Sequence, residues 1–377
     1  TNLFPHEAKP WFAPFNKRQF GALGKLCELE VLGPIPYYPG ATFFAPGSEA
    51  AQSKDAPSVE VIAGLKVKHP RWLHVPKITQ YTAGALYTAS LLPHVMQYRG
   101  KIDAILGGWA YPDGVAAILL AKMLGVPVVV KTFGSDINNL DCNMGARKQL
   151  EFFLPRAERV VAVSRQLKEK IISLGVLEGR IDVVHDGVDA KVFYPRDRAA
   201  ARRELQLTED APTVVYVGNV LQTKGLFDLI DSFQSVLHEI PDAQLVIVGS
   251  GAEMGACQER AASLGSSVIF AGRQPPDSIP QWMAAADIVT LPSWAEGTPN
   301  VVREASACGR RVVASNVGGI PDILDQQLLG ELIPPREPKA LAKALIRGIS
   351  DDYDADAVAK IGASHSWDDS ATDLLAS

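Results

Sequence analysis

Two glutamates, Glu296 and Glu304, have the spacing in this sequence that most suggests chemistry, because seven residues separate them within the segment from Pro292 to Ala305. Thr298 followed by Pro299 favours a helix start there, with a hydroxyl at the N-cap and proline at the first helical position. Free N–H groups at such a start bind phosphate, and carboxylates before and inside the helix can accept hydrogen bonds from sugar and ribose hydroxyls. A pair of solvated surface glutamates is the alternative.

A second loop with a candidate residue runs from Gly218 to Gly225, after the apolar run Val214–Val217 and before a helical segment. Its Lys224 places a cation at a helix N-terminus, where it opposes the helix dipole. A bound diphosphate would remove this conflict. A lysine that points to water, at a cost of roughly a few tenths of a kcal/mol, is the alternative that the residues leave open.

The elements that must position these loops are short apolar runs that alternate with amphipathic segments. The runs are rich in Val and Ile and bounded by Gly, Pro or Asp, which is typical of strands buried on both faces of a parallel sheet. They span residues 102–106, 126–130, 160–163, 181–184, 214–217, 245–248, 268–270, 288–291 and 312–314. The alternation predicts an α/β fold, in which ligands bind beyond the carboxyl ends of the strands.

Length and composition set the number of domains and exclude several classes of protein. The chain has 377 residues, of which 47% are apolar and 21% charged, so two globular domains of about 150 residues or more are expected. The net charge, 37 − 42 = −5, argues against nucleic-acid binding. No apolar stretch reaches about 18 residues, and no secretory signal starts the sequence.

The four cysteines are scattered, without a C-x-x-C pair or a Cys/His cluster. This pattern predicts neither disulfides nor a zinc site, and it favours a reducing, cytoplasmic location. The Asp354-Ala355-Asp356 triplet matches the D-x-D of metal-dependent transferases, but it lies in an acidic segment and not after an apolar strand. We interpret the triplet as a chance match, and we expect no metal site.

Several further segments resemble, in the right order, the motifs of the family 4 (group 1) retaining glycosyltransferases. Glu296 and Glu304 match the E-x7-E motif of that family. The other matches are Gly134-Ser135-Asp136-Ile137 with H-G-[ST]-D-I, residues 184–189 with I-x-N-G-V-D, residues 248–251 with V-G-D-G, and residues 318–322 with G-G-x-P-E. Each motif is weak alone, but the ordered set covers nearly the whole chain. Within the family, the segments at 111–114 and 294–300 are most similar to bacterial exopolysaccharide and teichuronic-acid type transferases.

The resemblance implies a GT-B fold, with two Rossmann-like domains that face each other across a cleft. The acceptor-binding domain would span residues 1–193 and the donor-binding domain residues 194–354, and a C-terminal helix at about 355–377 would pack back on the first domain. The implied activity is that of a retaining hexosyltransferase. It would move a sugar from a nucleoside-diphosphate sugar, by default UDP-linked, to a glycan or lipid-linked acceptor in cell-surface polysaccharide synthesis, with no metal or other cofactor.

The resemblance also implies roles for individual residues. Lys224 would pair with the donor diphosphate, Glu296 would hold the sugar, and Glu304 would bind the ribose, with Lys224 and Glu296 as the catalytic pair. The implied donor-binding set is Gly218, Asn219, Lys224, Gly249, Gly251, Arg273, Glu296, Gly297, Thr298, Pro299, Asn300, Val301 and Glu304. The implied acceptor-side set is Trp109, Gly134, Ser135 and Asp136, although Asp136 is equally well placed to cap a helix.

Two positions depart from the family pattern. Asn219 stands where the family usually has arginine, and Gly107-Gly108-Trp109 stands where many relatives have a His-x-His pair. Both departures motivate an alternative function, a catalytically silent protein that binds sugar nucleotides. The basic stretch from Lys66 to Lys77 could face a lipid-linked acceptor or the inner face of the membrane, as a peripheral contact, or could be a solvated loop.

Overall fold

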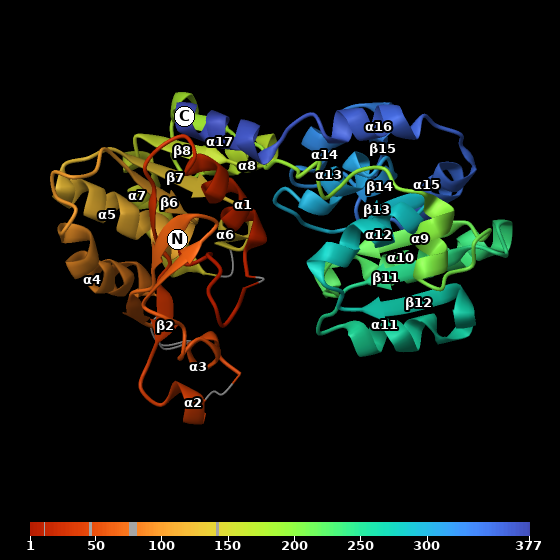
Figure 1. Cartoon of the computed structure of the whole chain (residues 1–377), viewed down its shortest axis with the longest axis horizontal. Coiled ribbons are helices and arrows are strands. Elements are labelled where there is room, and N and C mark those ends of the chain that lie inside the picture. Colours follow the sequence, from red (N-terminus) through yellow and green to blue (C-terminus); the bar gives the residue numbers. More distant parts are fainter. Residues whose placement is uncertain (11, 45–46, 75–80, 141–142) are drawn as a thin grey trace. The chain divides into compact units, whose positions relative to one another are not determined.

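The computed structural model describes residues 1–10, 12–44, 47–74, 81–140 and 143–377. The chain forms two compact units (Figure 1). Unit 1 comprises Thr1–Asp186 and Trp367–Ser377, and unit 2 comprises Gly187–Ser366. Both are α/β, as the alternation of apolar runs and amphipathic segments predicted.

Unit 2 is built on one parallel sheet of six strands, whose spatial order is β12-β11-β10-β13-β14-β15. The strands are β10 (Thr213–Val217), β11 (Gln244–Val248), β12 (Val268–Gly272), β13 (Ile288–Leu291), β14 (Arg311–Ser315) and β15 (Gly330–Ile333). Counted along the chain this is the order 3-2-1-4-5-6 of a doubly wound sheet. The order reverses between β10 and β13, so the loops after these two strands lie at the topological switch point, where such sheets bind ligands.

The helix α10 shows how an apolar stripe packs a helix into the core of this unit. In α10 (Leu226–Glu239) the buried apolar residues are Leu226, Leu229, Ile230, Phe233 and Val236. This spacing places them on one helical face, and each such side chain contributes about 1.5–3 kcal/mol when it is buried. The other helices of unit 2 are α9 (Arg198–Glu204), α11 (Met254–Ala261), α12 (Ile279–Ala285), α13 (Asn300–Ala307), α14 (Ile320–Ile323), α15 (Pro338–Ser350) and α16 (Ala355–Gly362).

Unit 1 contains a parallel sheet of four strands, in the order β6-β7-β8-β9, and two smaller sheets. The four strands are β6 (Ile105–Gly108), β7 (Val128–Thr132), β8 (Arg159–Ala162) and β9 (Ile181–Val183). The smaller sheets contain β1 (Glu30–Leu32), β4 (Leu65–Lys68) and β3 (Val59–Ile62), and β2 (Ile35–Tyr37) with β5 (Arg71–Leu73). The helices are α1 (Pro14–Leu23), α2 (Ala41–Phe44), α3 (Glu49–Gln52), α4 (Ala83–Met96), α5 (Val115–Leu124), α6 (Ser135–Asn138), α7 (Met144–Phe153), α8 (Arg165–Ser173) and α17 (Trp367–Ala376).

The division between the units differs from the predicted boundaries of 1–193 and 194–354. The first crossing falls after Asp186, and Phe193 is buried in the core of unit 2. The predicted C-terminal helix at 355–377 is two helices. The first, α16, packs against α13 inside unit 2, and only α17 packs against α1 in unit 1. Gly362 permits the close packing of α16, because a Cβ there would lie 2.3 Å from the backbone nitrogen of Ala307.

A chain of buried polar side chains connects α1, β7 and α17 to the residues at which the chain leaves unit 1. The Lys131 ammonium, on β7 and fully buried, lies 3.0 Å from the Asp186 carboxylate and also donates to the Gln19 side-chain oxygen. Gln19 Nε2 donates to Ser370 Oγ at 2.8 Å, and Ser370 Oγ donates to the His185 carbonyl at 2.6 Å. These bonds tie α1, β7 and α17 to His185 and Asp186, the last residues of unit 1 before the chain enters unit 2.

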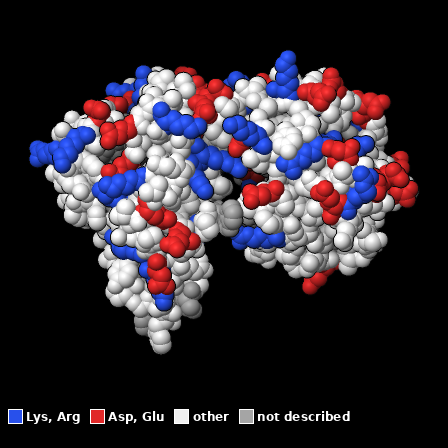
Figure 2. All heavy atoms as spheres, viewed as in Figure 1, with Lys and Arg blue, Asp and Glu red and all other residues white. Residues whose placement is uncertain are grey.

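The surface of the chain carries charges of both signs. On the face in Figure 2, Lys and Arg are interspersed with Asp and Glu, in keeping with the net charge of −5. Within the described ranges, no helix combines the length and apolar character that crossing a bilayer would need. The same ranges contain no group of three or more His, Cys, Asp or Glu side chains that could hold a metal ion.

Candidate active site

The loops after β10 and β13 bring Lys224 and Glu296 together. Lys224 ends a short 3-10 turn (Gln222–Lys224) after β10, and Glu296 lies in the loop between β13 and α13. Lys224 Nζ donates to Glu296 Oε1 at 2.6 Å, and Ser293 Oγ donates to the same oxygen at 2.7 Å. Only 8% of the Glu296 side chain and 22% of the Lys224 side chain are exposed, so this ion pair is partly shielded from water.

Tyr216 on β10 holds the backbone of the loop that follows this strand. The sequence did not predict this role. Its side chain is fully buried on β10, and its hydroxyl donates to the Asn219 carbonyl at 2.8 Å. Burial raises the pKa of the Tyr216 phenol, and the negative charge of Glu296 raises this pKa further. The phenol therefore stays a neutral donor that fixes the Asn219 backbone. The signal in the sequence was a tyrosine within an otherwise Val-rich run.

Gly249 and Gly251 let the loop after β11 approach the loop after β10. A Cβ on Gly249, whose φ is +148°, would lie 1.8 Å from the Gly218 carbonyl oxygen, and one on Gly251 would lie 2.1 Å from the Val220 carbonyl oxygen. The Val220 N–H also donates to the Ser250 carbonyl at 3.0 Å. These predicted donor-site glycines thus have a visible packing role at the carboxyl edge of the sheet.

The helix that carries Glu304 starts one residue later than predicted. Pro299, expected at the first helical position after a Thr298 cap, is itself the N-cap with φ −78° and ψ 112°, and α13 begins at Asn300. Its extended backbone explains the later start. The residues from Gly297 to Val301 and Glu304 are partly exposed, so they line an accessible edge of unit 2.

The turn after β14 holds the Glu296 loop from the other side. Gly318 has φ +60°, and a Cβ on it would lie 2.4 Å from the Glu296 carbonyl oxygen. The Gly319 N–H donates to the Gly297 carbonyl at 2.5 Å. The G-G-x-P-E-like segment therefore supports the backbone of the E-x7-E-like loop.

Of the other residues predicted to bind the donor, Gly218 is partly exposed, whereas Asn219 and Arg273 are exposed. Asn219 and Arg273 lie on exposed loops after β10 and β12. One cavity of about 120 Å³ on unit 2 is lined by Arg303 and residues of α14 and α16, and one of about 510 Å³ on unit 1 is lined by α8 and His185. Neither of these two cavities is lined by Lys224 or Glu296.

In unit 1, Asp136 ties together the loops after β6 and β7. Its carboxylate, 7% exposed, accepts the N–H groups of Ala110 at 2.9 Å, Phe133 at 3.1 Å and Gly134 at 2.8 Å. Burial raises the pKa of Asp136 to about 6, although these N–H groups oppose the shift. Ser135 is exposed beside it. The predicted helix-capping role of Asp136 is wrong, because Asp136 lies inside α6 and the N-cap is Gly134. Its side chain instead joins the loops after β6 and β7, and the acceptor contact stays a prediction.

Trp109, directly after β6, has a strained backbone. Its φ of 149° and ψ of 139° form a conformation that residues with a side chain rarely adopt, at a cost of about 1–3 kcal/mol. The indole stacks on Phe133, with ring centroids 6.0 Å apart, and remains partly exposed. The Asp136 bond to the next residue, Ala110, holds this conformation in place.

Two other predictions concern surface segments. Asp354 is the N-cap of α16 and accepts the Ala357 N–H at 3.0 Å, which agrees with a chance D-x-D match. In the basic stretch from Lys66, Lys68 lies 2.6 Å and Lys66 3.8 Å from the Glu30 carboxylate. Residues 75–77 of that stretch lie outside the described residues.

Comparison with a solved structure shows the fold of this protein, and two family models show its class. The Anabaena protein Alr3699/HepE, solved in complex with UDP and glucose, aligns with a TM-score of 0.73 at 19% identity, over 99% of this chain and 96% of its own. The fold is therefore that of the GT-B glycosyltransferases. Residues 41–192 match the model of Glycosyltransferase Family 4, and residues 211–351 match that of Glycosyl transferases group 1. The chain therefore belongs to the family 4 (group 1) glycosyltransferases, and it is a glycosyltransferase enzyme.

Two relatives in sequence extend over most of the chain. A Bacillus subtilis (strain 168) protein described as a teichuronic acid biosynthesis glycosyltransferase, TuaC, is 29% identical over 355 residues, 92% of this chain and 87% of its own length. A D-inositol 3-phosphate glycosyltransferase of Mycobacteroides abscessus is 29% identical over 357 residues, 88% of this chain and 78% of its own length.

Proposed function

We propose that this enzyme moves a sugar from a nucleoside-diphosphate sugar, with UDP as the favoured nucleotide, to a glycan or lipid-linked acceptor in cell-surface polysaccharide synthesis. The observation that carries the proposal is the Lys224–Glu296 pair, at 2.6 Å, on the two loops of the switch point of unit 2. The UDP and glucose bound to Alr3699/HepE and the teichuronic acid role in the name of TuaC support the donor and the glycan class.

In the proposed site, the donor lies over the carboxyl edge of the unit 2 sheet. The Lys224 ammonium and the free N–H groups at the start of α13 neutralise the diphosphate. Glu296 accepts hydrogen bonds from the sugar hydroxyls, and Glu304, inside α13, accepts them from the ribose. Gly249, Gly251 and Arg273 border the nucleoside. Because cationic and N–H groups stabilise the leaving diphosphate, we propose that the reaction needs no divalent metal or cofactor.

The proposed transfer retains the anomeric configuration of the sugar. The bond between the anomeric carbon and the diphosphate oxygen breaks, and the acceptor hydroxyl bonds to that carbon on the same face. The hydroxyl proton passes to the departing diphosphate. Lys224 Nζ has three N–H groups and donates to Glu296 in the structure, so another N–H can donate to the diphosphate when the donor binds.

Unit 1 is the proposed acceptor side, through Trp109, Gly134, Ser135 and Asp136. These residues lie at the carboxyl ends of β6 and β7, where open parallel sheets bind ligands. Strained backbone such as that of Trp109 clusters at functional sites. In this proposal Trp109 contacts the acceptor, and the buried Asp136 holds the two acceptor loops in register.

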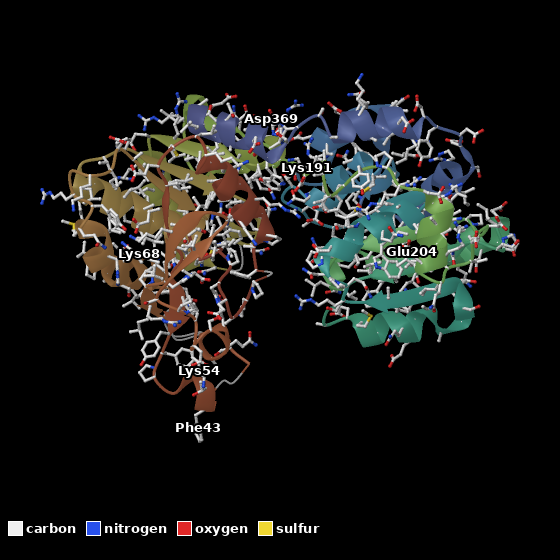
Figure 3. All side chains as sticks on the ribbon, viewed as in Figure 1. Phe43, Lys54, Lys68, Lys191, Glu204 and Asp369 are labelled. Carbon is white, nitrogen blue, oxygen red and sulfur yellow. The ribbon has the colours of Figure 1, made fainter. Side chains whose placement is uncertain are left out.

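We also propose a cytoplasmic enzyme with a peripheral membrane contact through unit 1. Phe43 on α2 is 82% exposed, and Lys54 follows α3, which packs against α2 (Figure 3). An exposed aromatic ring beside a cation suits the interface of an anionic bilayer. Cosedimentation with vesicles of anionic and of neutral lipid tests this contact. It is supported if Phe43→Ser lowers binding to the anionic vesicles, and it is rejected if the wild type binds neither.

A catalytically silent sugar-nucleotide-binding protein is the second candidate function. The exposed Asn219 favours it, because the family usually places an arginine there, and a charged hydrogen bond of this kind contributes about 1.5–3 kcal/mol. Incubation with a panel of UDP- and GDP-sugars and acceptor glycans separates the two, with nucleotide release as the readout. Release with one donor supports transfer. Donor binding in calorimetry without release by any acceptor supports the silent protein.

A further inference from the structure

Trp294 connects the two loops that carry Lys224 and Glu296. Its backbone N–H donates to the Thr223 carbonyl at 2.8 Å, across from β13 to the loop after β10. Thr223 is the neighbour of Lys224 in sequence, and Trp294 is two residues before Glu296. The Lys224–Glu296 ion pair and this backbone bond therefore form one closed bridge between the loops.

The indole of Trp294 fixes the orientation of this bridge. Its Nε1 donates to Asp228 Oδ2, in the first turn of α10, at 2.7 Å. It also lies close to Gly225, because a Cβ built there would be 3.5 Å from Nε1. A rotation of the indole would break the bond to α10. Trp294 therefore holds the loop after β13 both to α10 and to the turn Gln222–Lys224 that comes before this helix.

Arg336, in the loop after β15, covers the ring. Its guanidinium carbon lies 4.4 Å from the centre of the indole, which is a cation–π distance. The backbone of Arg336 has φ +62°, a left-handed conformation that is uncommon for a residue with a side chain. Three loops at the carboxyl edge of the sheet thus meet at Trp294.

We propose that Trp294 is a positioning residue of the donor site, which sets the separation and orientation of Lys224 and Glu296 through its bonds to Thr223 and Asp228. This inference rests on the proposed function, because it assigns Trp294 a role in the same site. A displacement of about 1 Å in a catalytic group can cost about 100-fold in rate. Loss of the indole N–H is therefore expected to lower kcat in a variant that remains folded.

The decisive variants distinguish the contribution of the indole N–H from that of the aromatic ring. Trp294→Phe keeps an aromatic ring and the backbone bond to Thr223 but loses the donor to Asp228. Trp282→Phe is the matched control, because Trp282 is also in unit 2 and its Nε1 has no hydrogen-bond partner among the described residues. Asp228→Asn keeps an acceptor for the indole and is expected to behave as the wild type, whereas Asp228→Ala removes it.

The measurements are UDP affinity by calorimetry, kcat and donor KM with the active UDP- or GDP-sugar, and the thermal midpoint. We expect Trp294→Phe and Asp228→Ala to lower kcat about tenfold at a temperature where they are folded, with Trp282→Phe and Asp228→Asn within twofold of the wild type. The double variant Trp294→Phe/Asp228→Ala should be no worse than either single variant. Equal kcat in Trp294→Phe and Trp282→Phe, or in Asp228→Ala and Asp228→Asn, would overturn the inference.

Failure of the proposed function gives a different result. If the wild type binds no nucleoside diphosphate in calorimetry, the donor site itself is rejected. The positional role is then decided by amide hydrogen exchange of the segment 292–299, which needs no ligand. Faster exchange in Trp294→Phe than in Trp282→Phe supports the bridge, and equal exchange rejects it.

Discussion

Lys224 and Glu296 are 72 residues apart in the chain, yet Lys224 Nζ and Glu296 Oε1 lie 2.6 Å from each other. The doubly wound order of the unit 2 sheet explains this contact, because it makes β10 and β13 parallel neighbours, so the loops after them start side by side at the same edge of the sheet. The sheet order thus places the two residues to which we assign the proposed chemistry next to each other.

Removal of the negative charge of Glu296 should separate nucleotide binding from transfer. In Glu296→Gln, Lys224 loses its charged partner and becomes available to a diphosphate, while the sugar loses a charged acceptor. We expect UDP affinity that is unchanged or a few-fold higher and a kcat that is lower by at least about 100-fold. Calorimetry and nucleotide release measure the two effects. Lower UDP affinity together with normal kcat would contradict the assigned roles.

Glu304 and Asp354 give a matched pair of carboxylates for the donor assignment. Glu304→Ala should weaken UDP binding by about ten- to 100-fold, because a charged hydrogen bond to the ribose contributes roughly 1.5–3 kcal/mol. Asp354→Ala should leave UDP binding unchanged and reduce stability by about 1 kcal/mol through loss of the α16 N-cap. Titration calorimetry and urea unfolding measure both. Equal UDP affinity in Glu304→Ala and wild type would reject the ribose contact.

Asp136 should make the stability of unit 1 depend on pH between about 4 and 6. Its folded pKa of about 6 lies above the ordinary value of 3.8, so the folded state holds this proton more tightly than the unfolded state in that range. Stability from this group is therefore present at low pH and is lost as the pH rises to about 6. The free energy of unfolding of the wild type relative to Asp136→Asn should fall by about 1–3 kcal/mol from pH 4 to pH 7.

Chemical unfolding of both proteins at pH 4, 5, 6 and 7 measures this difference. The variant acts as the reference for every other titrating group, because those groups are shared. A difference between the two proteins that is constant with pH would show that the pKa of Asp136 is not shifted, and one that grows as the pH rises would show that it is lowered; either result would contradict the prediction.

Removal of one partner of the buried Lys131–Asp186 ion pair should lower the free energy of unfolding more than replacement of both partners by apolar residues. Lys131→Met leaves the Asp186 carboxylate, 6% exposed, without its cation and is expected to cost about 3–5 kcal/mol. The double variant Lys131→Met/Asp186→Leu should recover much of that loss, because no isolated charge remains. Urea unfolding measures both. A double variant less stable than Lys131→Met would contradict the prediction.

The sequence predicted the fold because the information for it is local. Val-rich runs such as Val214–Val217 and Ile288–Leu291 specify buried parallel strands by composition and flanking residues alone. The E-x7-E-like spacing likewise lies within one loop and one helix. Lys224 and Glu296 could each be singled out in their own loop, although their contact depends on strand order.

The features that the sequence did not predict depend on contacts across the chain. Trp294 reads as one aromatic residue in a loop until Asp228 and Arg336, far from it in sequence, are seen to surround its ring. The burial of the Asp186 carboxylate against Lys131, 55 residues away in the chain, likewise depends on a contact that no local pattern contains. The C-terminal helix was predicted as continuous, but it breaks at residues 363–366, directly after Gly362, whose lack of a side chain lets α16 pack closely against α13.

The most direct test of the central claim is a calorimetric titration of UDP and GDP into the wild type and Lys224→Met. If the Lys224–Glu296 edge of unit 2 is the diphosphate site, one nucleotide binds the wild type, and Lys224→Met weakens this binding at least about tenfold, the effect of one charged contact. Binding of neither nucleotide to the folded wild type, or equal affinity in Lys224→Met, would contradict the claim.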